Sequence, residues 1–112
     1  MKASLGSLLA RLPGPSSEKW PDGEPSAVAF GHGTMSVEVF APRGQDQQTP
    51  HSQDELYFIM SGSADFIREG RRSQVALGDA LFVPANERHH FENISNDFLS
   101  WVVFWGPNGG ER

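Results

Sequence analysis

Residues 49–62 read TPHSQDELYFIMSG and place a histidine, a glutamine and two carboxylates directly before an apolar run. The run 56–60 is rich in aromatic and β-branched residues, which favours a β-strand, and Gly62 marks the turn after it. Alternate side chains of a strand share a face. If the segment is extended, one face carries Thr49, His51, Gln53, Glu55 and Tyr57. Such polar groups are costly to bury alone, and a bound cation would be a partner for several of them at once.

The rest of the sequence indicates short strands separated by turns. Its 12 glycines and 8 prolines interrupt 112 residues, a pattern more typical of strands than of long helices. A hairpin turn is expected at Gly70. The sequence therefore predicts an all-β sandwich or barrel, with strands at 34–40, 55–60, 64–69, 73–77, 80–83, 89–93 and 98–105.

The N-terminal part of the chain differs in character from the rest. A short amphipathic helix is expected before Pro13, followed by a proline-rich extended arm. We expect one domain, with residues 1–27 packing as helix and arm on a barrel of residues 28–112. The apolar stretch near the N-terminus is too short for a signal peptide or a membrane span, so no membrane partner and a cytoplasmic location are expected.

Composition narrows the classes of partner. A net charge of −5 argues against nucleic acid, and the absence of cysteine excludes disulfides, thiolate metal sites and cysteine nucleophiles. The strands at 55–60 and 101–105 are apolar on both faces, although a small barrel has only one inner face. Something must cover the outer face, and we expect a homodimer, with the arm covering part of it.

A second segment, residues 78–93, repeats the pattern of a strand, a turn and polar groups, as GDALFVPANERHHFEN. One strand ends at Pro84, and the next opens with two adjacent histidines. Because side chains alternate, only one of these imidazoles can face inward. His89 shares its face with Phe91, which leaves His90 on the opposite side.

These two segments resemble the two motifs of the cupin family. The second motif is matched by the set Gly78, Pro84, Asn86, His89 and Asn93. Asn86 stands where the family has glycine, a mild change, since asparagine tolerates left-handed backbone geometry.

The first cupin motif is matched in part, by His51, Glu55 and Gly62. Thr49 then stands where the family has its first histidine. An alternative register makes His51 the first histidine and Gln53 the second, but it requires a shortened gap before Glu55.

The resemblance implies a jelly-roll barrel, or double-stranded β-helix, with one divalent transition metal in its lumen. The implied ligands are His51, Glu55 and His89, with Gln53 and Thr49 as additional ligands or as support for them. Two histidines and a carboxylate suit non-haem Fe(II), and Mn, Ni, Cu or Zn could also occupy such a site. The expected pocket for a small molecule beside the ion is lined by Tyr57 and Phe91.

The family leaves several functions open. The ion could serve a dioxygenase, or it could polarise a carbonyl in a sugar or keto-acid isomerase, as in relatives labelled mannose-6-phosphate isomerase-like. If a proton is transferred, Glu55 or His51 is the expected carrier. The alternative is a non-enzymatic barrel that binds or senses a small ligand, which the threonine at position 49 favours slightly.

Overall fold

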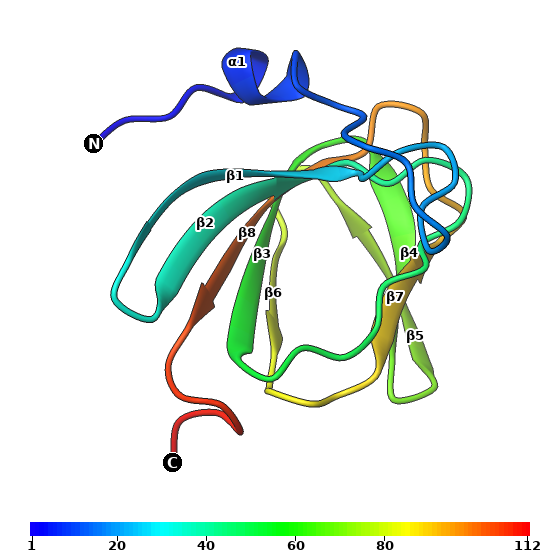
Figure 1. The fold of residues 1–112 in the computed structure, drawn as a ribbon. Coiled ribbons are helices and arrows are strands. Elements are labelled where there is room, and N and C mark those ends of the chain that lie inside the picture. The colour runs from blue at the N-terminus through cyan, green and yellow to red at the C-terminus, as the bar shows by residue number, and fades with distance from the viewer.

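Eight strands form two antiparallel sheets that face each other in the computed structural model, which describes residues 1–112 (Figure 1). The larger sheet has the order β1-β2-β8-β3-β6 and the smaller one β5-β4-β7. The elements are α1 (Leu5–Leu9), β1 (Ser26–His32), β2 (Met35–Phe40), β3 (Asp54–Ser61), β4 (Ser63–Arg68), β5 (Arg71–Ala76), β6 (Ala80–Val83), β7 (His89–Glu92) and β8 (Leu99–Trp105). The all-β jelly-roll prediction is confirmed. No helix of the protein has the length and apolar character needed to cross a bilayer.

The sequence did not predict β1. This edge strand pairs only with β2, and its register shifts between Val28 and Phe30. Its small residues and the glycines on both sides of His32 resemble a loop, because an edge strand has little need of large buried side chains. The barrel strands therefore begin at Ser26, two residues before the expected boundary.

The lumen between the sheets holds the main apolar core. Tyr57 and Phe91 are almost fully buried there, with their ring centroids 5.2 Å apart in an edge-to-face arrangement. Phe40 packs against both rings from β2. Burial of one such side chain contributes roughly 1.5–3 kcal/mol, so these rings fix the distance between the two sheets.

A smaller core lies on the outer face of the large sheet, under α1. Leu8 of the helix is buried against Val39 and Leu99. Figure 1 shows the helix lying across the end of β1 and β2. The helix therefore covers one part of the outer face that the arm was expected to cover.

The remainder of that outer face is apolar and has no cover from the chain itself. Phe58 of β3 is 40% exposed, and Phe82 of β6 is 48% exposed. Trp105 stacks near Phe82, with centroids 6.1 Å apart. The expected excess of apolar outer surface is therefore present.

Several turns need left-handed backbone, and two of them bear on the cupin motifs. Asn86 has φ +67°, so asparagine does take the geometry of the glycine that it replaces. Gly62 has φ +74°, and a Cβ there would lie 2.7 Å from Asp97 Oδ1 and 2.8 Å from the Cα of Phe98. Gly62 is therefore required both by φ and by close packing.

We predict that Gly62→Ala destabilises the protein more than Gly70→Ala. Gly70 has φ +79°, but a Cβ there would meet nothing within 4 Å, so that variant carries only the backbone cost of about 1–3 kcal/mol. Gly62→Ala adds about 1–3 kcal/mol of overpacking. Urea denaturation of both variants measures the difference, and equal stabilities would show that Gly62 is not closely packed.

Candidate metal centre

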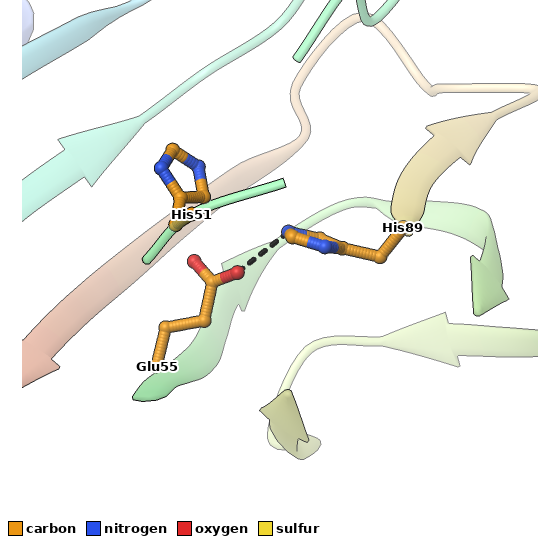
Figure 2. A group of neighbouring side chains, drawn as sticks. All are labelled: His51, Glu55 and His89. Atoms are coloured by element: carbon orange, nitrogen blue, oxygen red, sulfur yellow. Dashed lines mark ion pairs between the residues drawn. The ribbon is translucent and has the colours of Figure 1, made fainter. Parts of the chain in front are cut away.

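Three polar side chains meet in the lumen from different parts of the chain. Glu55 lies at the start of β3 in the large sheet, His89 begins β7 in the small sheet, and His51 lies on the loop before β3. One ligand atom from each lies within 4.8 Å of the others. Figure 2 shows the carboxyl group of Glu55 between the two histidines. The structure thus brings together the three residues that were expected to act as metal ligands.

The loop that carries His51 is held by backbone hydrogen bonds. The carbonyl of His51 accepts a hydrogen bond from the N–H of Asn86, in the turn before β7, at 2.7 Å. The carbonyl of Ser52 accepts one from the N–H of Gly109 at the same distance. The His51 ring also packs against Phe104, with centroids 4.7 Å apart. The imidazole is therefore positioned by both the second motif and the C-terminal tail.

The contact between His89 and Glu55 is the closest in the group. Nε2 of His89 lies 2.6 Å from Oε1 of Glu55, and both side chains are buried. The other ring nitrogen, Nδ1, lies 2.9 Å from the carbonyl of Glu87. A carbonyl only accepts, so Nδ1 carries a proton and donates it, which leaves Nε2 directed at the carboxylate.

A proton or a metal ion is required between these two atoms. A neutral Nε2 and an ionised carboxylate are both acceptors and would repel each other at this distance. Burial by itself lowers the pKa of His89, but the hydrogen bond to Glu55 and its charge outweigh burial and raise the pKa. A proton meets the requirement in the chain alone, and a metal ion would meet it equally.

The second oxygen of Glu55 has no partner. Oε2 is buried and receives no hydrogen bond, the one buried side-chain polar atom left in this state. Leaving a buried polar group unsatisfied costs about 1–3 kcal/mol, and more for a charged one. A cation between the three side chains would provide the missing partner, so the donor set fits a metal ion.

His51 is suited to act as a neutral ligand. Burial is the main cause that lowers its pKa, and the charge of Glu55 only partly offsets this. A lowered pKa keeps the imidazole unprotonated at neutral pH, with a ring nitrogen free to donate its lone pair.

A chain of hydrogen bonds connects His89 to the loop between β2 and β3. The Tyr57 hydroxyl lies 3.1 Å from Nε2 of His89 and donates to Oε1 of Gln48 at 3.0 Å. Asp46 accepts from the Gln48 side chain at 2.6 Å and from the N–H of Phe91 at 2.9 Å. Sequence reasoning missed Asp46 and Gln48, which lie in a polar loop without any motif.

Gln53 and Thr49 have other partners. The amide nitrogen of Gln53 donates to the carbonyls of Thr34 and Gly106, both at 2.9 Å. Thr49 is exposed, and its hydroxyl accepts from the Lys19 amine at 3.2 Å. The alternation expected over 49–59 holds only within β3, because the segment before Asp54 is not a strand. The structure therefore does not bring either side chain to the three.

Of the two adjacent histidines, only one faces the lumen. His90 is on the outer face of β7, where Nε2 lies 2.7 Å from Oε2 of Glu92. The alternation of side chains thus predicted the two orientations correctly.

A cavity of about 320 Å³ adjoins the group at His51, the one member of the three that lines it. Tyr57 and His51 line it, whereas Phe91 does not and packs instead in the aromatic core. The N-terminal arm forms one wall, which the sequence did not predict because the arm was expected on the outer face. The arm contributes Lys19, Trp20 and Glu24 to the lining of the cavity, and β2 contributes Glu38.

A second hollow, of about 550 Å³, lies between α1, the arm and the loop after β2. None of the three clustered residues lines it. Arg43 does, but its guanidinium donates to the carbonyls of Pro42 and Phe98. Of the two hollows, only the smaller one therefore adjoins the clustered residues.

Comparison with known proteins agrees with this architecture. The sequence profile of the cupin domain matches residues 36–105, which include both motifs. The chain belongs to the cupin family. An uncharacterised protein of Streptomyces coelicolor is 45% identical to this cupin over 75 residues, covering 65% of the chain and 71% of that protein.

Two characterised or solved relatives are more distant. Dimethylsulfoniopropionate lyase DddQ of Ruegeria pomeroyi is 32% identical over 57 residues, which are 50% of this cupin and 28% of the lyase. The crystal structure of that lyase superimposes on this protein with a TM-score of 0.62 and 25% identity, over 72% of this chain and 46% of the lyase chain. KdgF from Halomonas matches 74% of this chain and 78% of its own, with a TM-score of 0.63 and 20% identity. The chain therefore spans less than half of the lyase, and the likeness to KdgF concerns the fold.

Proposed function

We propose that this cupin is a metal-dependent enzyme that acts on a small molecule in the cavity beside His51, Glu55 and His89. The observation that carries the proposal is the buried carboxylate of Glu55. One of its oxygens is in close contact with an imidazole nitrogen, and the other has no partner. Burying such a group is unfavourable unless a cation completes it.

The three residues would hold one divalent transition metal, and Fe, Mn, Ni, Cu or Zn all accept imidazole and carboxylate together. Such an ion acts as a Lewis acid on a carbonyl or carboxylate oxygen. The chain's own contribution is orientation: the Glu87 carbonyl fixes the ring of His89, and Tyr57 packs beside it. Hydrogen bonds of this kind raise the basicity of a ligating imidazole and hold its direction.

Proton transfer is the reaction class that we favour, in a lyase or an isomerase. Two observations support it: the likeness to a lyase, and the carboxyl groups of Glu24 and Glu38 in the wall of the cavity. Carboxyl groups near a carbonyl substrate can remove and return protons.

A dioxygenase is the second candidate, because two histidines and one carboxylate form the donor set typical of non-haem Fe(II) oxygenases. The identity of the bound metal distinguishes a proton-transfer enzyme from a dioxygenase. Iron with substrate-dependent oxygen uptake would favour the dioxygenase, and a barrel that binds the ion without turnover would be a binding module.

We predict near-stoichiometric transition metal in protein purified without a metal-chelating tag. His89→Ala should lose it, because the variant removes one of the three proposed ligands. His90→Ala is the matched control, since that imidazole is the next residue but lies on the outer face. Elemental analysis of the three proteins measures the difference.

Thermal unfolding gives a second measure of the same site. An ion present at a hundredfold above its Kd stabilises the folded state by about 2.7 kcal/mol, which raises Tm by roughly 10 °C in a domain of this size. Chelation should remove this increment from the wild type and from His90→Ala only. Equal metal content in His89→Ala and His90→Ala would contradict the ligand assignment.

We also infer that a second copy of the chain covers the outer face of the large sheet. Phe58 and Phe82 would be at the centre of that interface, since both are large, apolar and substantially exposed. Light scattering after size exclusion should report a dimer for the wild type and a monomer for Phe58→Ser with Phe82→Ser. A monomeric wild type would contradict the inference and leave the apolar face without a partner.

A further inference from the structure

Glu38 is a lumen residue that the cupin motifs do not include. It lies in the middle of β2 and pairs with Val102 of β8, which in turn pairs with Tyr57 of β3. Residues directly opposite on neighbouring strands point to the same face of a sheet. Val102 and Tyr57 are buried between the sheets, so Glu38 also points into the lumen.

The side chain of Glu38 lines the same cavity as His51, one of the three residues of the candidate metal centre. Tyr57 and Trp20 of the arm line it as well. A molecule of a few carbon atoms bound in about 320 Å³ would therefore contact both Glu38 and His51.

Unlike the carboxylates with a structural role, Glu38 has no partner within the chain. Asp46 accepts hydrogen bonds from Gln48 and Phe91, and Asp54 accepts them from the N–H groups of Ala85 and Glu111. No hydrogen bond or ion pair is made by the side chain of Glu38. A carboxyl group that holds a fold is satisfied by it, whereas this one is free for a bound molecule.

We propose that Glu38 is the catalytic residue that takes a proton from a carbon atom of the bound substrate and later releases it. This role rests on the proposed function of the cavity as a substrate site. The substrate class is a small molecule with an acidic C–H bond next to a carbonyl or carboxylate group.

The proton balance is simple and needs no oxidant or reductant. The C–H bond breaks, an O–H bond forms on the Glu38 carboxylate, and the electron pair stays on the substrate as an enolate. In an isomerase, Glu38 gives the proton to the neighbouring carbon. In a lyase, the electron pair forms a C=C bond and expels the group on the β-carbon, and the proton passes from Glu38 to that group or to water.

The environment of Glu38 suits this task. Burial, followed by the charges of Glu24 and Glu55, raises the pKa of Glu38 from 4.5 to about 7. A pKa near the working pH is optimal for an acid–base group. The other titratable groups that line the cavity are Lys19 from the arm, His51 from its loop and Tyr57 from β3. A cation on Glu55 would offset only that carboxylate, the smallest of the three causes.

A substrate-free measurement tests the first part. In metal-free protein with carbon-13 in its glutamate carboxyl groups, we expect one resonance with a midpoint near pH 7 that is absent from Glu38→Gln. A Glu38 that titrates in the ordinary range, about pH 4.3, would overturn the proposal. Metal content and Tm of Glu38→Gln should match or exceed those of the wild type, because a partnerless carboxyl group is removed without loss of a ligand.

Exchange of carbon-bound hydrogen tests the second part. Metal-loaded protein is incubated in heavy water with dimethylsulfoniopropionate, pyruvate or dihydroxyacetone, and loss of the proton next to the carbonyl or carboxylate is followed by NMR. We expect the wild type to accelerate exchange of at least one probe and Glu38→Gln to lose about 10²–10⁴-fold of that rate. Glu92→Gln, on the outer face of the small sheet, is the matched control and should retain it.

The outcomes separate this role from the proposed function. Exchange that is lost in His89→Ala but retained in Glu38→Gln would overturn the role of Glu38 and leave the metal enzyme standing. No exchange by the metal-loaded wild type with any probe would overturn both.

Discussion

The close contact between His89 and Glu55 is the constraint around which the barrel is organised. Nε2 of His89 and Oε1 of Glu55 lie 2.6 Å apart with both side chains buried, and two atoms that both accept hydrogen bonds stay this close only with a proton or a metal ion between them. The two residues belong to opposite sheets, so the same proton or ion also links the two halves of the jelly roll. Architecture and candidate chemistry therefore depend on one contact.

The surroundings of this contact explain why it can be buried. Aromatic rings of Tyr57, Phe66 and Phe91 pack around it and keep the two sheets at a fixed separation. The loop between β2 and β3 runs along the opening between the sheets and ends at the start of β3 (Figure 1). That loop carries His51 and the supporting pair Asp46 and Gln48. The small cavity is therefore bounded by polar groups of defined orientation, as expected of a site that positions a ligand.

Much of the fold followed from the sequence because the strands have strong local signals. The apolar runs of β3 and β8 and the glycine and proline turns identified seven of the eight strands. The match to the two cupin motifs identified His51, Glu55 and His89. Strand alternation accounts only for Glu55 and His89, because His51 lies on the loop before β3. β1 was missed because an edge strand with small residues carries little pattern.

Other parts of the site could not be predicted from the sequence, because they depend on tertiary placement. Glu38 alternates with Val37 and Val39, and an apolar row next to a charged residue suggests that the charge faces water. Here α1 covers Val39, so the strand has cover on both faces and the carboxyl group points inward. Gln53 was expected to face the lumen because it has the parity of Glu55. It does not, because the chain before β3 is not a strand and the alternation does not extend to it. The arm was equally ambiguous, since proline-rich sequence does not indicate which surface it crosses.

Diffraction from crystals grown with the metal-loaded protein, measured above and below the absorption edge of the metal, tests the central interaction most directly. One anomalous peak should lie at about 2.0–2.2 Å from Nε2 of His89, a ring nitrogen of His51 and an oxygen of Glu55. In that state His89 and Glu55 should no longer share a direct hydrogen bond. A peak at any other place, or a loaded protein in which that hydrogen bond persists, would contradict the metal centre.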